Sequence, residues 1–223
     1  MGTYLNPGYE NFEEALNSNI YVDKTEMVLY TNSVIRTKQK YLCVSRPRRF
    51  GKSMAVDMLC AYYEQKKSRE YFDGTKLAEH DGWDQYLNQF DVIRIVMTDF
   101  IKERVEVEKS LKAVTKRILD DLSEKYPDVK YDQDDLFYSM DRFYRKSGIP
   151  FVIIIDEWDA VFRERKDDKD GQTLYLDFLR DWMKDKQYIA LAYMTGILPI
   201  KKYGKHSALN MFSEFSMIHP MQL

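Results

Sequence analysis

Residues 41–53 read Tyr41-Leu42-Cys43-Val44-Ser45-Arg46-Pro47-Arg48-Arg49-Phe50-Gly51-Lys52-Ser53. The apolar run at 41–44 predicts a buried strand, and the Gly-Lys-Ser that closes the basic loop predicts the start of a helix. A strand, a loop ending in Gly-Lys-Ser and a helix together form the context of a phosphate-binding P-loop, the Walker A motif. This stretch therefore predicts an α/β fold that binds a nucleotide.

Each residue type at the end of this loop has a chemical role. Gly51 lets the main chain approach a phosphate, Lys52 reaches the β- and γ-phosphates, and Ser53 places its hydroxyl on Mg²⁺. The free N–H groups of the following helix face the anion. The candidate nucleotide contacts are therefore Arg48, Arg49, Phe50, Gly51, Lys52, Ser53 and Met54. Arg46 stands where the usual motif has its first Gly, so this motif needs a partner elsewhere in the chain.

The partner lies in residues 151–161, Phe151-Val152-Ile153-Ile154-Ile155-Asp156-Glu157-Trp158-Asp159-Ala160-Val161. Five apolar residues predict a strand buried on both faces, and it stops at two carboxylates. Ligands of parallel sheets bind at the carboxyl ends of the strands. Asp156 is then expected to hold Mg²⁺ through its waters, and Glu157 to activate the attacking water, as in a Walker B motif. An acidic helix N-terminus is the alternative, and the upstream Gly-Lys-Ser favours the nucleotide site.

The composition limits the class of protein. The 34 basic and 36 acidic residues give a net charge of −2, which provides no overall attraction to nucleic acid or to an anionic membrane. Cys43 and Cys60 have no metal-binding spacing and are expected to be reduced core residues. The N-terminus does not resemble a signal peptide, and no apolar run is long enough to cross a bilayer. We therefore expect a cytoplasmic protein with no membrane partner.

Five strands are expected, at 41–45, 91–98, 151–155, 188–194 and 212–218. Helices are expected near 11–16, 24–37, 52–66, 105–125, 134–147 and 172–186. Residues 1–40 are expected to be an N-terminal lead-in that packs on the core, and residues 41–223 to be the P-loop core, with lid and C-terminal domain absent.

This order of elements is compatible with the additional-strand (ASCE/AAA-like) class of P-loop NTPases, with a mostly parallel sheet sandwiched by helices. In that class an extra strand lies between the P-loop strand and the Walker B strand, and it ends in a polar residue near the γ-phosphate. Thr195 follows the strand at 188–194 and fits this sensor role. The alternative is a strand-ending Thr before a turn at Gly196.

Four segments together resemble the AAA-ATPase-like family of predicted bacterial ATPases. They are Tyr21-Val22-Asp23-Lys24-Thr25, Ser45 to Ser53, Ile155 to Asp159, and Thr195-Gly196-Ile197-Leu198-Pro199-Ile200-Lys201-Lys202-Tyr203-Gly204. The resemblance implies Walker A roles for Lys52 and Ser53, Walker B roles for Asp156 and Glu157, and the sensor position for Thr195. The family pattern itself carries Arg-Pro-Arg-Arg-Phe-Gly-Lys-Ser, so Arg46 resembles a family trait. Members often continue into a C-terminal PD-(D/E)xK nuclease domain, which is expected to be absent here.

The favoured function is Mg²⁺-dependent binding and hydrolysis of ATP, coupled to a conformational change, with Lys52, Glu157 and Thr195 acting on the γ-phosphate. The paired carboxylates favour hydrolysis over phosphoryl transfer by a small-molecule kinase, and the absence of an Asn-Lys-x-Asp run favours ATP over GTP. One alternative is a nucleotide-dependent scaffold with little hydrolysis, acting on a protein partner or as a homo-oligomer. Another is an accessory domain to a nuclease, with nucleic acid bound through the missing C-terminal domain or through the basic loop at 46–49. For the arginines of that loop, one expectation is that one of them contacts a phosphate group. The alternatives are that the loop is solvated, or that its arginines form salt bridges with the acidic segment 156–168.

Overall fold

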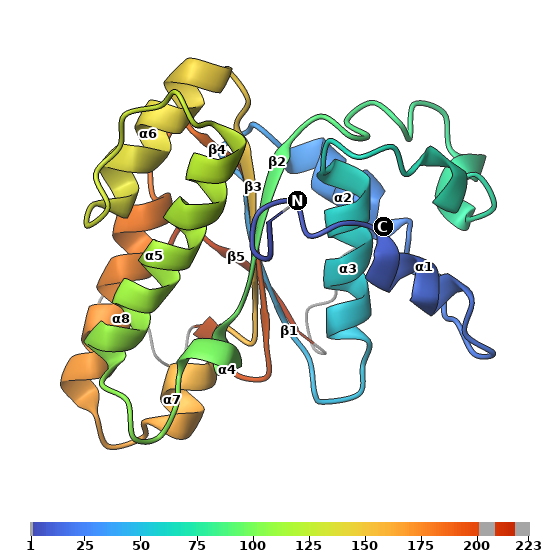
Figure 1. Ribbon diagram of the computed structural model, residues 1–223. Coiled ribbons are helices and arrows are strands. Elements are labelled where there is room, and N and C mark those ends of the chain that lie inside the picture. Colours follow the sequence, from blue (N-terminus) through green and yellow to red (C-terminus); the bar gives the residue numbers. More distant parts are fainter. Residues whose placement is uncertain (1, 201–207, 217–223) are drawn as a thin grey trace.

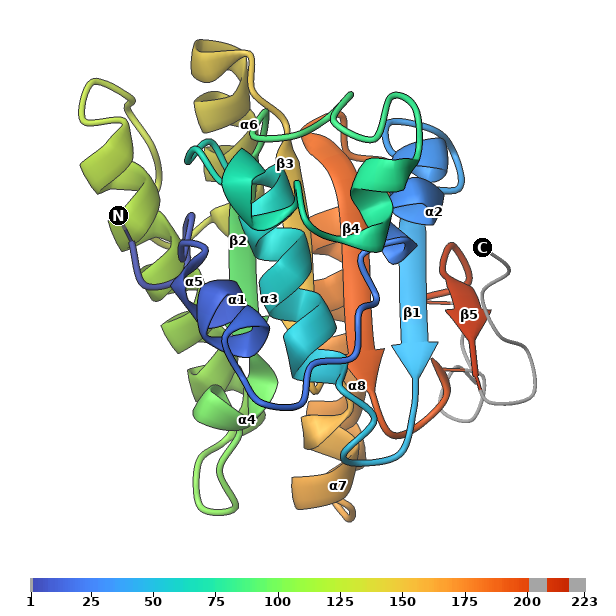
Figure 2. The same cartoon turned by 90° about the vertical axis from the view of Figure 1, so that its right-hand side faces the viewer.

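A computed structural model describes residues 2–200 and 208–216 of the chain. Its described strands form one all-parallel sheet in the order β2-β3-β4-β1-β5, which Figure 2 shows from one face. The strands are β1 (Tyr41–Ser45), β2 (Asp91–Val96), β3 (Phe151–Asp156), β4 (Ile189–Gly196) and β5 (Ser213–Phe215). The expected fold class is confirmed: β4 follows β3 in the chain but lies between β3 and β1 in the sheet.

Helices cover both faces of the sheet (Figure 1). One layer contains α4 (Met97–Phe100), α5 (Val107–Lys125), α6 (Leu136–Ser147), α7 (Ala160–Glu164) and α8 (Lys169–Met183). The other contains α1 (Glu10–Leu16), α2 (Met27–Val34) and α3 (Lys52–Tyr63), followed by short 3₁₀ helices at Arg69–Tyr71 and Lys76–Glu79. Two hydrophobic clusters fill the spaces between the sheet and these layers. Because both faces are covered, β3 and β4 are buried along their whole length.

Most of the expected boundaries are close to the observed ones. The amphipathic helix predicted at 105–125 begins at Val107 and buries its apolar face, including Leu111 and Ile118. The strand predicted at 91–98 ends earlier, at Val96, because the chain turns into α4 and the Ile101 N–H bonds to the Met97 carbonyl. Residues 201–204 of the fourth family-like segment, and the end of the strand expected at 212–218, lie outside the described residues.

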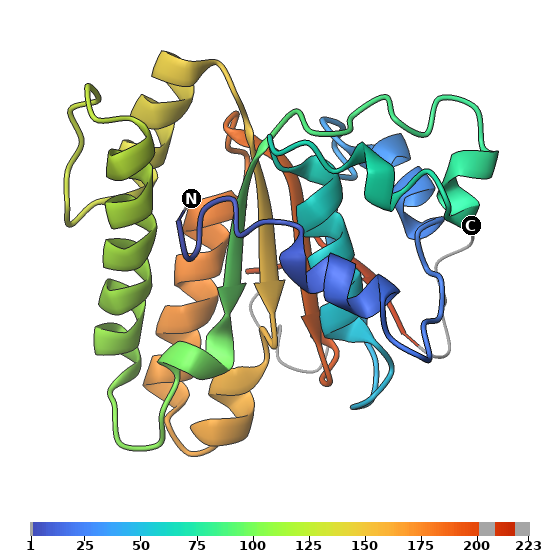
Figure 3. The ribbon, with the colours of Figure 1, turned by 45° about the vertical axis from the view of Figure 1, so that its right-hand side comes forward.

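The N-terminal segment lies against the edge strand β2, as Figure 3 shows. Leu5 forms an antiparallel bridge with Ile93, and the Asn6 N–H donates to the Val92 carbonyl at 2.7 Å. Helix α1 then packs beside α3, with Phe12 fully buried. The loops that carry the two motifs lie elsewhere, at the end of the sheet where the strands terminate.

The register of the strands places their carboxyl ends at one edge. Val44 lies opposite Thr195 on β4, and Val96 of β2 lies opposite Asp156. Figure 1 shows α4, α7 and the loop between β1 and α3 at this same end of the sheet. The ends of these four parallel strands therefore meet where a ligand of such a sheet binds.

Candidate nucleotide-binding site

The loop at 46–51 joins β1 to α3 and has two residues in the left-handed region, Arg49 at φ 68° and Gly51 at φ 70°. Gly51 is the N-cap of α3, and a Cβ at this position would lie 2.6 Å from the Lys24 Nζ. Only glycine fits both constraints without strain. The N–H groups of the first turn of α3 have no intrahelical acceptor and open toward this loop.

Three cations gather at the loop, and their described partners are main-chain carbonyl oxygens. Lys52 Nζ donates to the carbonyls of Arg46 at 3.1 Å and Pro47 at 2.9 Å. Lys24 Nζ donates to the Phe50 carbonyl at 2.6 Å, and Arg46 donates to the Ser45 carbonyl. Burial and the neighbouring Arg46 charge lower the pKa of the Lys24 ammonium. The positive charge at this site is therefore not neutralised by carboxylates in the described part of the chain.

A cavity of about 290 Å³ lies beside these cations. Its acidic lining residues are engaged elsewhere: Asp23 accepts hydrogen bonds from Thr25 and from the Lys76 N–H, and Glu26 contacts His80. The apolar part of the wall comes from Met27, Val44, Ala55, Tyr193 and Phe215. The lining of the cavity thus combines cationic and apolar side chains.

The remaining predicted loop contacts lie at the surface. Arg48, Arg49 and Phe50 are exposed, with Phe50 at 48%, and Met54 is half-buried on α3. The alternative in which the loop arginines pair with segment 156–168 is not observed among the described residues. The carboxylates of Glu157, Asp159 and Asp168 pair instead with Arg163 and Arg165.

The two motifs meet at Ser53 and Asp156. Ser53 Oγ donates to Asp156 Oδ2 at 2.8 Å, and Asp156 Oδ1 accepts from the Glu157 N–H at 2.9 Å. Asp156 is 2% exposed. Burial raises the pKa of its carboxyl, and these two hydrogen bonds partly oppose the shift. A hydroxyl and a carboxylate are thereby held together at the end of β3.

Glu157 lies in the turn that follows β3, with φ 52°. Its Oε2 accepts from Arg163 Nη2 at 2.9 Å, and Arg163 Nε also lies 3.4 Å from Asp159 Oδ2. Sequence reasoning did not single out Arg163. The available signal was its i+4 spacing from Asp159 on a short helix, a spacing that brings side chains together.

Thr195 lies at the end of β4, fully buried, and its hydroxyl has no hydrogen-bond partner among the described residues. Its carbonyl accepts from the Trp158 N–H at 3.0 Å, which ties β4 to the turn after Glu157. Buried hydroxyls without partners are uncommon in proteins, so the position of this one needs an explanation.

A family model described as predicted AAA-ATPase matches residues 7–205. The chain belongs to the AAA-ATPase-like family. The matched region contains the loop with Lys52, the pair Asp156 and Glu157, and Thr195. No curated protein matches this AAA-ATPase-like chain. None of its described helices has the length and apolar character that a membrane span needs.

The donor set of this AAA-ATPase-like chain fits a magnesium ion. The described residues contain no cluster of three or more His, Cys, Asp or Glu side chains that could hold a metal alone. Ser53 and Asp156 offer two oxygen donors at 2.8 Å from each other. Mg²⁺ is typically held by one or two protein oxygens, with the remaining positions taken by water and substrate phosphates.

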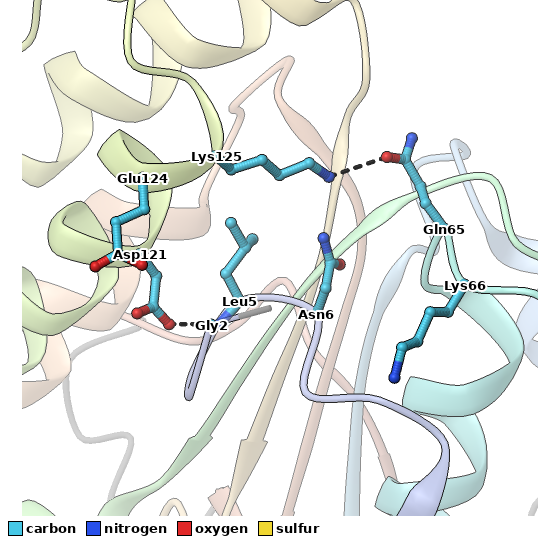
Figure 4. Close-up of a pocket in the computed structure, with 8 residues that line it drawn as sticks. All are labelled: Gly2, Leu5, Asn6, Gln65, Lys66, Asp121, Glu124 and Lys125. Atoms are coloured by element: carbon cyan, nitrogen blue, oxygen red, sulfur yellow. Dashed lines mark hydrogen bonds between the residues drawn. The ribbon is translucent and has the colours of Figure 1, made fainter.

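A second cavity, of about 440 Å³, lies where the N-terminal segment meets the ends of α3 and α5 (Figure 4). Two of its charged groups already have partners: Asp121 accepts from the N–H groups of Tyr4 and Leu5, and Lys125 contacts Gln65 and Asp91. This cavity is part of the junction that fixes the N-terminal segment of the AAA-ATPase-like chain, and it lacks the loop and carboxylates of the first site.

Proposed function

We propose that this chain binds ATP with Mg²⁺ at the loop 46–53 and hydrolyses the β–γ phosphoanhydride bond. The observation that carries the proposal is the 2.8 Å contact between Ser53 Oγ and Asp156 Oδ2, which joins the two halves of the predicted site. Cations without carboxylate partners lie beside it, and membership of the predicted AAA-ATPase family supports the same class of ligand.

The triphosphate would bind along the loop. Lys52 would exchange the Arg46 and Pro47 carbonyls for β- and γ-phosphate oxygens, which are stronger acceptors because they are charged. The N–H groups at the start of α3 face the same anion. The apolar wall that includes Tyr193 and Phe215 suits the flat face of a purine.

Magnesium would be held by Ser53 and Asp156, and its charge would neutralise phosphate oxygens of the bound nucleotide. Burial of Asp156 keeps this carboxylate in place at the end of β3. Its other oxygen, Oδ1, accepts from the Glu157 N–H, and this main-chain contact helps to fix the direction of the carboxylate.

Glu157 would orient the attacking water and accept its proton. The water oxygen forms a bond to the γ-phosphorus while the bond to the bridging oxygen of ADP breaks, giving ADP and inorganic phosphate. Thr195 would supply a hydrogen bond to the γ-phosphate or to the water, the partner that its hydroxyl lacks in this structure. Since Thr195 is fully buried, this contact requires the site to open, which links turnover to a conformational change.

The test combines binding and turnover. We expect Mg-ATPγS at about one hundred times its dissociation constant to stabilise the parent by roughly 2.7 kcal/mol in thermal unfolding. K52A should lose this shift. E157Q should keep it but release phosphate more slowly by a factor on the order of 100 or more, because removal of a general base has that effect. K112A, on the exposed face of α5, is the control and should behave as the parent.

Two outcomes would contradict the proposal. No shift in the parent, or an equal shift in K52A, would show that the loop does not bind the nucleotide. A shift without phosphate release in the parent would instead support the nucleotide-dependent scaffold. Protein partners, homo-oligomers and nucleic acid bound through a C-terminal nuclease domain stay predictions of the sequence.

A further inference from the structure

We propose that Arg163 is a positioning residue: it fixes the Glu157 carboxylate and couples it to the turn that follows Thr195. This inference rests on the proposed function, since it concerns how the hydrolytic groups of that site are arranged. It adds to that site a residue from α7 that neither motif contains.

The contact leaves one carboxylate oxygen of Glu157 available. Arg163 Nη2 binds Oε2 at 2.9 Å, whereas Oε1 makes no hydrogen bond to any described residue. An oriented general base needs this arrangement, because one oxygen must be held while the other accepts a hydrogen bond from the attacking water.

Glu157 needs a restraint of this kind because of its place in the chain. It lies between the end of β3 and the start of α7, at φ 52°, so neither a strand nor a helix sets the direction of its side chain. Its side chain is 35% exposed and would otherwise sample several rotamers. The Arg163 side chain is 15% exposed and is itself held between two carboxylates.

The second carboxylate connects Arg163 to β4. Asp159 is fully buried, and its Oδ2 accepts from the N–H groups of Ile197 at 3.2 Å and Leu198 at 3.0 Å. These residues follow Thr195 and Gly196 directly. Arg163 therefore lies between Glu157, to which it donates a hydrogen bond, and Asp159, with which it forms an ion pair at 3.4 Å and which holds the turn beyond Thr195.

The neighbouring Arg165 provides a matched control. It has a similar exposure, 20%, and it binds Asp168 and the main-chain carbonyls of Glu103 and Val105, not Glu157. Loss of Arg165 removes an ion pair from the end of α7, although its partner Asp168 is 29% exposed, whereas the Arg163 partner Asp159 is fully buried. Loss of Arg163 removes in addition the restraint on Glu157.

The experiment measures kcat, KM and the Mg-ATPγS thermal shift of R163M, R163K and R165M in the full chain. We expect R163M to keep the parent's KM and thermal shift while kcat falls on the order of 100-fold, the effect of misplacing a reacting group by about 1 Å. R163K keeps the charge and should recover part of kcat. R165M should keep the parent's kcat. In E157Q, the further change R163M should have no effect on kcat, because the group that it positions is already lost.

Several results would overturn the positioning role. One is a kcat of R163M equal to that of the parent, and another is a fall of kcat in R165M as large as that in R163M. A third is a kcat of E157Q/R163M that is lower than that of E157Q alone. If R163M does not fold, R163K provides the test. A folded R163K that has lost the contact with Glu157 and still has the parent's kcat contradicts the inference. If the unmodified protein binds Mg-ATPγS but releases no phosphate from ATP, the hydrolytic function itself is wrong. This outcome is distinct from those that contradict only the role of Arg163.

Discussion

Ser53 and Asp156 are 103 residues apart in the chain, and their side chains form a hydrogen bond of 2.8 Å. Strand β1 precedes Ser53 and β3 ends with Asp156, and these two strands are not neighbours, because β4 lies between them. The contact therefore depends on the first turn of α3, which brings Ser53 across the end of β4 to the end of β3. Thr195 lies near the end of β4, the strand between β1 and β3.

Replacing Ser53 by alanine should weaken Mg-ATP binding. The hydroxyl is a proposed magnesium ligand, and a bond to a charged group contributes about 1.5–3 kcal/mol. Apparent affinity should fall by roughly tenfold to a hundredfold in a titration of the thermal midpoint. S53T keeps the hydroxyl and should bind as the parent does, and chelation of magnesium should reproduce the S53A result in the parent. Equal affinity in S53A and S53T would exclude Ser53 from the metal site.

Replacement of Thr195 by valine should lower turnover without lowering stability. T195V removes a buried hydroxyl that has no described partner, so the free energy of unfolding should stay the same or rise by about 1 kcal/mol. Phosphate release should fall by roughly 100-fold, as for the loss of one donor to a transition state. Chemical denaturation and a phosphate assay measure the two effects, with T195S as the variant that restores the hydroxyl. Parental turnover in a stable T195V would remove Thr195 from the proposed mechanism.

Substitution of Gly51 by alanine has two effects, one on the backbone and one on the contact with Lys24. Comparison with the same substitution at Gly82 separates them. Both have φ near 70°, but a Cβ at Gly82 meets nothing within 4 Å, whereas at Gly51 it lies 2.6 Å from Lys24 Nζ. G82A should therefore cost only the strain of the left-handed backbone, roughly 1 kcal/mol. G51A should cost about as much, because only the flexible end of Lys24 has to move, and it should also abolish the Mg-ATPγS shift, because Lys24 then loses its contact with the Phe50 carbonyl of the loop. If G51A binds the nucleotide normally, the loop conformation seen here is not the one that binds.

Asp91 should matter for stability and not for the nucleotide. It is fully buried at the amino end of β2 and accepts hydrogen bonds from Lys125, from the Tyr126 hydroxyl at 2.5 Å and from Asn6 at 3.0 Å. D91A should lower the free energy of unfolding by about 3 kcal/mol, because Lys125 loses its buried partner. D84A, which removes an exposed partner of Arg69, should change little. A Mg-ATPγS shift retained in D91A would confirm that this cluster is separate from the site, and a lost shift would contradict it.

The fold could be predicted because its signals are local. The apolar runs at 41–44 and 151–155 become β1 and β3, and the apolar face at Leu111 and Ile118 becomes the buried side of α5. Cys43 and Cys60 are buried and unpaired, as expected. The end of β2 was missed by two residues, because only the hydrogen bond from Ile101 to Met97 shows that the chain has turned into α4.

The contacts of Lys24 and Arg163 could not be predicted in the same way. Lys24 reaches the Phe50 carbonyl from a segment that precedes β1, and the contact depends on how α2 and the loop pack. Arg163 meets Glu157 only because the turn after β3 takes a left-handed residue and then starts a short helix. Both are long cations whose contacts are set by three-dimensional placement: the i+4 spacing of Arg163 points to Asp159 and not to Glu157, and Lys24 has no spacing that points to the Phe50 carbonyl.

By itself, the sequence determined which chemical groups the site contains and at which strand or loop end each of them lies. A parallel strand that stops at Asp156, and a loop that stops at Gly51 and Lys52, must present these residues at the same edge of the sheet. Only the tertiary structure decided which groups meet. The insertion of β4 between β1 and β3 places Thr195 near the end of the strand next to β3, the first turn of α3 brings Ser53 to Asp156, and the turn into α7 sets Arg163 on Glu157. The physical reason is that strand and helix formation follow local periodicity, whereas side-chain contacts between distant segments depend on how those elements pack.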